Sequence, residues 1–301
     1  MLMAAVLSVA IARSASALTV AVLYPEAAAP YRALFAEILE GIEGGLPPQT
    51  VHRYALPPEL DTVALDRWID RLAPDAVITL GRVAADYYEA RPAKKPWIVG
   101  ALDASPQTRP KARGVSLAVD PALLFATLRQ LAPTKRRIWV VFDPASERWL
   151  VDLAHAAART GGLSLTPLPA SDAKTAWRQF AHVFETADPD TDALWLIANP
   201  QLVDPSAVLP ALVEKSWRRS LVLFTNSLHH VHRGALFALY PDNRRLGGRL
   251  AELALQARDA APAIEPLRAV KRAINLKIAT HLALRIDQPL EREFDLVLPP
   301  W

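Results

Sequence analysis

The chain has 301 residues, of which 51% are hydrophobic and 22% are charged, and it contains no cysteine. This length and balance are typical of a folded protein of one or two domains, and they exclude a disordered chain. Without cysteine, a disulfide, a thiolate zinc site and a cysteine nucleophile are excluded as well. The net charge of +3 comes from basic residues spread along the chain, so we predict no nucleic-acid partner.

The first 17 residues have the pattern of an export signal. Residues 2–12 are apolar, Arg13 follows, and Ala15 and Ala17 form a small-x-small pattern that predicts a signal peptide cut after Ala17. No lysine or arginine precedes the apolar run, so an upstream start or an uncleaved anchor remains an alternative. The run is shorter than the roughly 20 apolar residues that span a bilayer. We therefore expect a secreted, periplasmic protein.

The segment 18–43 predicts the first strand and the first helix. Residues 18–24 are an unbroken apolar run of strand length, which Pro25 and Glu26 end. From Tyr31 onward, apolar residues recur every three or four positions, as on one face of a helix. A fully apolar strand followed by a one-faced helix is the opening unit of a parallel sheet covered by helices.

The same alternation continues in chain order. Helices are predicted after the Asp61-Thr62 cap and at 83–91, 121–131, 147–159, 173–186, 205–218, 242–258 and 275–284. Further strands are predicted at 76–80, 97–102, 114–119, 137–142, 163–166, 193–198, 221–225, 235–239 and 294–298. Pro262 and Pro266 predict a linker. The pattern favours an α/β fold with two sheets of about five strands each, since larger sheets are less common.

Small, polar or turn residues follow six of the predicted strands. They are Tyr24-Pro25-Glu26, Gly81-Arg82-Val83, Ala101-Leu102-Asp103, Asp143-Pro144-Ala145-Ser146, Asn199-Pro200 and Thr225-Asn226-Ser227. Each of these ends has a structural alternative, because such residues also terminate strands and cap helices. Together they predict a pocket, because ligands of parallel sheets lie at the carboxyl ends of the strands, where helix N-termini offer amides to an anion.

Arg82 is the sharpest single candidate for ligand binding. It stands between a buried strand and a helix, where its guanidinium could bind a ligand carboxylate with two hydrogen bonds. The alternative is a solvent-facing arginine at a helix start. Trp149 and Tyr24 also lie close to strand ends and could stack on a ligand ring, whereas core packing is the default for the other tryptophans.

Catalytic and metal-binding patterns are poor. The chain lacks a G-x-S-x-G elbow, a G-x-x-x-x-G-K-[ST] loop and a G-x-G-x-x-G turn after a strand, so we predict no enzyme and no cofactor. His229, His230 and His232 are close in sequence, but adjacent imidazoles on a helix point apart. No carboxylate between Ser227 and Tyr240 completes a ligand set, so we predict no metal site.

In order and spacing, the chain resembles the substrate-binding proteins of ABC transporters with the type I periplasmic binding fold, in particular the group linked to aromatic amino-acid uptake. The resemblance lies in VAVLYPE, DAVITLGRVAADYY, KPWIVGALDAS, GVSLAVDPALLFATLRQLAPTKRRIWVVFDPAS, DALWLIANP, VHRGALFALYPDNRRLGGRLAELAL and the closing AVKRAINLKIATHLAL with Asn275.

The resemblance implies two Rossmann-like lobes with parallel sheets, joined by three hinge crossovers, with a ligand held between them. The N-terminal lobe would comprise residues 18–118 and 241–268, and the C-terminal lobe residues 119–240 and 269–301. The ligand-facing positions it implies are Tyr24, Gly81, Arg82, Val83, Ala101, Asp103, Ser146, Asn199, Asn226 and Ser227, to which the first strand end adds Glu26. The chain departs from the family pattern at Arg82, where the family has a small or hydroxyl residue, and at 147–149, where it tends to have Asn-Ser.

We therefore predict a periplasmic solute-binding protein that captures an amino acid or related carboxylate between two lobes and delivers it to an ABC permease. We expect a monomer whose protein partner is that permease or a sensor protein in the inner membrane. Two alternatives stay open at this point. One is a secreted ligand-sensing adaptor for a signalling or receptor system, and the other is a secreted α/β hydrolase that uses Asp103 or Asp143.

Overall fold

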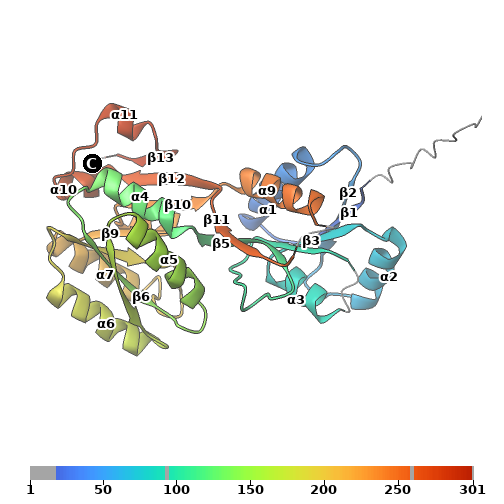
Figure 1. Cartoon of the computed structure of the whole chain (residues 1–301), viewed down its shortest axis with the longest axis horizontal. Coiled ribbons are helices and arrows are strands. Elements are labelled where there is room, and N and C mark those ends of the chain that lie inside the picture. The colour runs from blue at the N-terminus through green and yellow to red at the C-terminus, as the bar shows by residue number, and fades with distance from the viewer. Residues whose placement is uncertain (1–17, 92–94, 258–260, 300–301) are drawn as a thin grey trace, which may run out of the picture.

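The computed structural model describes residues 18–91, 95–257 and 261–299, which form two α/β lobes side by side (Figure 1). The predicted signal peptide, residues 1–17, lies outside the described residues. Within the described ranges, no helix combines the length and the apolar character needed to cross a membrane.

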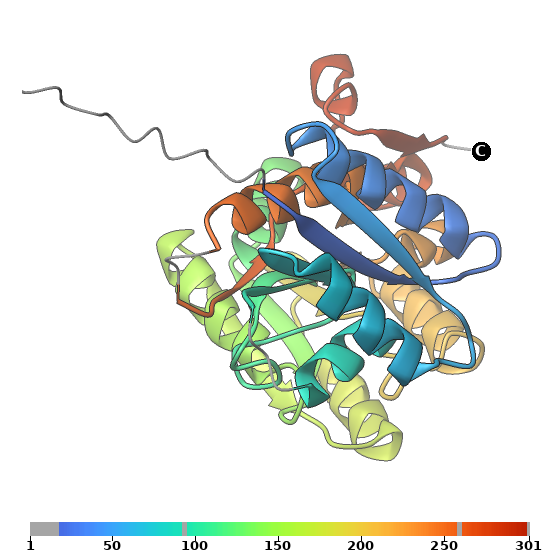
Figure 2. The same cartoon turned by 90° about the vertical axis from the view of Figure 1, so that its right-hand side faces the viewer.

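The first lobe is built on a parallel sheet of six strands in the order β11-β5-β4-β3-β1-β2. The strands are β1 (Val20–Pro25), β2 (Val51–Leu56), β3 (Ala76–Leu80), β4 (Trp97–Gly100), β5 (Arg113–Val119) and β11 (Ile264–Leu267). Helices α1 (Tyr31–Gly44) and α9 (Asn243–Leu255) cover one face, and α2 (Thr62–Leu72) and α3 (Arg82–Ala90) cover the other (Figure 2). Because β3 and β4 are buried on both faces, their residues are apolar except for Thr79, whose hydroxyl accepts a hydrogen bond from Trp97 Nε1 at 2.8 Å.

Helices α1 and α9 pack with their backbones in contact. A Cβ atom at Gly247 would overlap the carbonyl oxygen of Ile38 and lie 2.9 Å from the Cα of Gly41. A Cβ atom at Gly41 would in turn overlap the carbonyl oxygen of Arg244. Glycine is therefore required at both positions, because only a residue without a side chain lets the two helices come this close.

The second lobe has a sheet of seven strands in the order β13-β12-β10-β9-β8-β6-β7. The strands are β6 (Arg137–Phe142), β7 (Ser164–Pro169), β8 (Asp192–Leu196), β9 (Val222–Thr225), β10 (Phe237–Pro241), β12 (Val270–Asn275) and β13 (Leu296–Leu298). Helices α4 (Pro121–Leu131) and α5 (Arg148–Thr160) lie on one face, and α6 (Ala173–Thr186), α7 (Val208–Arg218) and α8 (Leu228–Arg233) on the other. The short helices α10 (Leu276–His281) and α11 (Gln288–Glu291) follow β12.

The structure corrects the predicted elements near the C-terminus. The segment around Pro262 and Pro266, predicted as a linker, contains β11, and β12 follows it without an intervening helix. Pro266 is tolerated because β11 is an edge strand whose register shifts between Glu265 and Leu267. Strand β12 runs antiparallel to β10, so the second sheet is mostly rather than wholly parallel. Strand β2, which the sequence analysis did not predict, is a half-exposed edge strand without a continuous apolar run.

The chain crosses between the lobes three times: after β5, after β10 and after β11. Backbone hydrogen bonds tie the crossings together, from Asp120 N to Leu267 O (2.9 Å) and from Asp242 N to Ala269 O (2.9 Å). An ion pair joins Arg268 Nε to Asp120 Oδ2 at 3.0 Å. The predicted fold class, two α/β lobes joined by three crossovers, is confirmed.

Candidate functional site

A cleft of about 710 Å³ lies between the two lobes. The first lobe contributes the start of α3, the loop after β4 and part of β5, and the second lobe contributes the loops after β6, β8 and β9. The carboxyl ends of neighbouring parallel strands meet at one edge of a sheet, so both lobes present these ends to the same space. The lining residues are Arg82, Leu102, Asp103, Ala104, Ser105, Thr108, Arg109, Ser116, Ala118, Asp143, Ser146, Glu147, Trp149, Leu150, Ile197, Ala198, Asn199, Pro200, Gln201 and Asn226.

The residues predicted from the sequence divide among three places. Five of them line the cleft: Arg82, Asp103, Ser146, Asn199 and Asn226. Gly81, Val83, Ala101 and Ser227 adjoin lining residues in sequence but do not line the cleft themselves. The remaining two, Tyr24 and Glu26, line a separate groove of about 400 Å³ between α1 and strands β1 and β2.

Tyr24 and Glu26 follow β1, which lies between β2 and β3 in the sheet. The helix after β1 covers a different face from the helix after β3 (Figure 1). The loops after β1 and β3 therefore border a switch point of the kind where parallel sheets bind ligands. Pro25 lies 3.8 Å from the Cβ position of Gly81, so the groove beneath α1 adjoins the start of α3, whose first residue, Arg82, lines the cleft.

Arg82 and Asp103 form the charged part of the first-lobe wall. Gly81 follows β3 with φ +79°, a conformation that favours glycine, and α3 begins at Arg82 directly after it. The side chains of Arg82 and Asp103 are both exposed to the cleft. Surrounding protein still desolvates the Asp103 carboxylate and raises its pKa, while the positive charge of Arg82 acts in the opposite direction.

The other cation in the cleft is already neutralised. Arg109 forms ion pairs with Asp86 and Glu89, both on α3, and only 13% of its side chain is exposed. These pairs anchor the loop after β4 to α3. Among the described residues that line the cleft, Arg82 is thus the one cation outside an ion pair.

The hydroxyl of Ser116, a buried residue of β5, also holds the loop after β4 in place. Its Oγ accepts hydrogen bonds from the backbone amides of Ala104 and Ala118, each at 3.1 Å. A single hydroxyl therefore fixes the backbone next to Asp103, because buried amides need an acceptor.

Glu147 is the main acidic group of the second-lobe wall. Its Oε2 accepts a hydrogen bond from the backbone amide of Asp143 at 2.7 Å, and its Oε1 accepts one from Asn199 Nδ2 at 3.1 Å. Burial raises the pKa of Glu147 to about 7. The two hydrogen bonds oppose this shift, and the negative charges of Asp143 and Asp103 add to it. The contribution of Asp103 places a first-lobe carboxylate within electrostatic reach of Glu147.

Hydrogen bonds also fix the two asparagines of this wall. Asn226 Oδ1 accepts from the amide of Ala198 at 3.0 Å, and Asn199 Oδ1 accepts from the amide of Gln201 at 3.0 Å. The Nδ2 of Asn226 has no hydrogen-bond partner within the described part of the chain. The wall is thus held in place by its own backbone and retains a free amide donor.

Trp149 connects the two lobes across the cleft. It belongs to α5 of the second lobe, yet it packs against the apolar cluster of the first lobe that includes Leu102 and Ala104. All three residues line the cleft. Sequence analysis marked Trp149 as a candidate for stacking on a ligand, and the structure adds this contact with the opposite lobe.

Several lining residues were missed at the sequence level. Glu147 begins a predicted helix and there resembles an ordinary capping residue, but its carboxylate turns back toward Asp143. Ser105, Thr108 and Arg109 lie in a proline-containing stretch without periodicity, and Ser116 lies inside a strand. The available signal was weak: Glu147 directly follows the strand end at 143–146, which the sequence analysis had already singled out.

The three histidines on α8 form no metal site. No group of three or more His, Cys, Asp or Glu side chains in the described ranges could hold a metal ion. His230 is buried, and its Nδ1 lies 2.9 Å from Thr225 Oγ1, whereas His229 is exposed. Burial, together with the nearby His229, lowers the pKa of His230 to about 4.

This buried histidine should make the protein acid-sensitive. The neutral form of His230 is favoured in the folded state, so its contribution to stability is complete above pH 6.5, and it is lost as the pH falls from there toward 4. The loss should be on the order of 3 kcal/mol. Denaturant unfolding at pH 7.5 and 4.5 measures it. His230→Gln should show a smaller drop between the two pH values than the wild type, whereas exposed His232→Gln should match the wild type. Equal drops in all three proteins would refute this prediction.

Comparisons with known proteins identify the fold. No protein-family model matches the sequence, and no curated protein matches it. Among solved structures, the chain is similar to a substrate binding protein with adhesive properties from Clostridium difficile, in its ligand-free, open structure, with a TM-score of 0.65 and 13% identity over 93% of this chain and 99% of that one. It is also similar to an ABC domain in complex with L-Trp from Streptococcus pneumonia, with a TM-score of 0.59 and 17% identity over 94% of this chain and 100% of that one. The chain is similar as well to a conserved domain protein from Vibrio cholerae, with a TM-score of 0.58 and 14% identity over 94% of this chain and 100% of that one. These similarities extend over nearly the whole of each chain, and the shared architecture is that of type I periplasmic binding proteins.

Proposed function

We propose that the protein is a periplasmic solute-binding protein that captures an amino acid or related carboxylate in the interlobe cleft and delivers it to an ABC permease. The observation that carries this proposal is the cleft itself, in which polar side chains of both lobes face one another. A ligand held by both walls stabilises the closed arrangement, and closure excludes water and strengthens each polar contact.

The two lobes would move about the three crossovers. In this proposal, residues 18–118 and 241–268 form one body, and residues 119–240 and 269–301 form the other. The small-x-small pattern before Leu18 supports export to the periplasm. Arg82 would bind the ligand carboxylate, and Asp103, Ser146, Asn199 and Asn226 would contribute further polar contacts.

The test asks whether a solute binds in the interlobe cleft or in the groove beneath α1. Purified protein is screened by thermal shift against a library of amino acids, amines, organic acids and sugars, and hits are measured by calorimetry. Ala198→Trp places an indole in the interlobe cleft, since Ala198 is exposed and lines it. Ala36→Trp is the matched control, because Ala36 is also exposed but lines the groove beneath α1.

We expect Ala198→Trp to abolish the shift produced by a hit, and Ala36→Trp to leave that shift unchanged. The reverse pattern would place the ligand in the groove with Tyr24 and Glu26. A library without a single binder would refute the solute-binding proposal.

A further inference from the structure

Negative charge outweighs positive charge in the interlobe cleft. In the part of the chain that the structure describes, three carboxylates line it: Asp103, Asp143 and Glu147. Of the two lining arginines, Arg109 is held by Asp86 and Glu89, so Arg82 is left to balance the three. Unpaired carboxylates in a partly desolvated site are unfavourable, and a cation that enters the site removes this penalty.

The carboxylates also lie on opposite walls. Asp103 follows β4 of the first lobe, and Glu147 begins α5 of the second. Glu147 accepts hydrogen bonds from the backbone amide of Asp143 and from Asn199 Nδ2, and both of these N–H donors are uncharged. No positive charge therefore compensates the carboxylate of Glu147. The carboxylate that acts on it electrostatically from the opposite wall, Asp103, is also negative.

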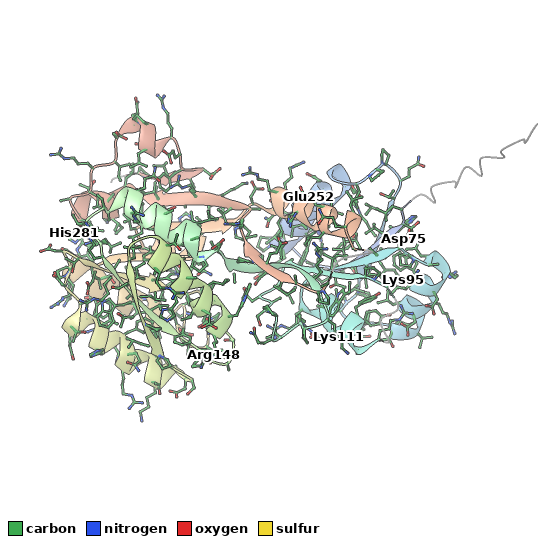
Figure 3. All side chains as sticks on the ribbon, in the orientation of Figure 1. Asp75, Lys95, Lys111, Arg148, Glu252 and His281 are labelled. Atoms are coloured by element: carbon green, nitrogen blue, oxygen red, sulfur yellow. The ribbon has the colours of Figure 1, made fainter. Side chains whose placement is uncertain are left out.

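Basic residues outside the cleft do not supply the missing charge. Arg148 and Lys111 are both exposed, and neither lines the cleft. Figure 3 shows Arg148 on the side of the second lobe that is nearer the first lobe, and Lys111 on the lower edge of the first lobe. Charges in such exposed positions are screened by water and salt far more than charges within the cleft.

We propose that the cleft takes a solute of net positive charge, whose ammonium or guanidinium group lies between Asp103 of the first lobe and Glu147 of the second. This inference rests on the proposed function and narrows its ligand to a basic amino acid, whose carboxylate would face Arg82. A diamine or an agmatine-like amine offers the same cation without the carboxylate. One cation shared by carboxylates of both lobes would also link binding to closure.

The probes are L-arginine, its uncharged near-isostere L-citrulline, its decarboxylated analogue agmatine, L-glutamate and D-glucose, all measured by calorimetry at pH 7. We expect L-arginine to bind at least tenfold more tightly than L-citrulline. Glu147→Gln keeps the shape of the side chain and one acceptor oxygen, but it removes the charge and one of the two hydrogen bonds that Glu147 accepts. The variant should weaken the affinity for L-arginine at least tenfold and change the affinity for L-citrulline by no more than about twofold. Asp103→Asn should act in the same way from the other lobe.

The number of protons released when L-arginine binds gives a second readout. A cation beside Glu147 lowers its pKa, so binding of L-arginine should release up to about half a proton at pH 7. This release is seen as a dependence of the binding enthalpy on the buffer, and it should vanish in Glu147→Gln. The matched control is Glu214→Gln, which removes an exposed carboxylate paired with Arg218 on α7 and should change nothing.

The outcomes separate the two proposals. If agmatine binds as tightly as L-arginine, the cation site stands and the ligand is an amine rather than an amino acid. If L-glutamate, L-citrulline or D-glucose binds at least as tightly as L-arginine, or if Glu147→Gln leaves the affinity for L-arginine unchanged, this inference falls and the solute-binding function stands. If no solute of the library binds, both fall.

Discussion

Gly247→Ala should destabilise the first lobe by about 3–4 kcal/mol. The added Cβ would overlap the carbonyl oxygen of Ile38 and approach the Cα of Gly41 to 2.9 Å, and neither backbone group can rotate away. The helices α1 and α9 must then separate, and the apolar contacts around Ile38, Ile42 and Leu250 open with them. Overpacking of side chains usually costs about 1–3 kcal/mol, and a clash of backbone against backbone belongs at or above the top of that range.

A neighbouring glycine provides the control. A Cβ atom at Gly44, at the end of α1, would meet no heavy atom within 4 Å. Gly44→Ala should therefore leave stability unchanged or raise it by up to about 1 kcal/mol, because alanine favours the helix. Denaturant titration with circular dichroism measures both variants. A Gly247→Ala protein as stable as the wild type would mean that the two helices are not in backbone contact.

Arg82→Ala should weaken binding of a carboxylate ligand about 100-fold. Among the described residues that line the cleft, the variant removes the one cation that forms no ion pair with an acidic side chain. It would leave the ligand carboxylate among Asp103, Asp143 and Glu147. A charged hydrogen-bonded pair contributes about 2–3 kcal/mol, which corresponds to roughly 30-fold to 150-fold in affinity.

The ligand itself provides the control for Arg82. Agmatine has no carboxylate, so Arg82→Ala should bind it as tightly as the wild type does, or more tightly, while L-arginine loses affinity. Arg148→Ala removes an exposed arginine that does not line the cleft, and it should bind L-arginine normally. A loss of the same size for L-arginine and agmatine would show that Arg82 supports the fold of the cleft rather than the carboxylate of the ligand.

Much of the fold could be predicted because its signals are local. The runs around Val22, Ile78 and Ile98 are almost wholly apolar because parallel strands are buried on both faces. Asp61, Asp120 and Asp172 were recognisable as caps, and each accepts a hydrogen bond from the helix that follows it. The two edge strands of the first sheet gave no such signal. Strand β2 is half exposed, and β11 contains a proline, so neither has the composition of a buried strand.

The candidate site was predicted less completely, because a cleft depends on where loops go after their strands end. Asp103 and Asn199 were identified from their positions after apolar runs, and both line the cleft. By the same argument Tyr24 and Glu26 were expected beside them, but they line the groove beneath α1, and no local pattern shows which of two neighbouring cavities a loop lines. Glu147 was missed because its role depends on a side chain folding back onto Asp143 and on Asn199, 52 positions away.

The sequence by itself determined that this chain forms strands and one-faced helices in alternation, because burial on both faces of a sheet or on one face of a helix leaves its period in the residue order. Only the tertiary structure decided which strand ends share the space between the lobes, and that Asp103 and Glu147 face it from opposite lobes. The physical reason is that electrostatic and hydrogen-bonding contacts depend on distance in space. The sheet order and three crossovers bring residues far apart in the chain together, and no local pattern records that arrangement.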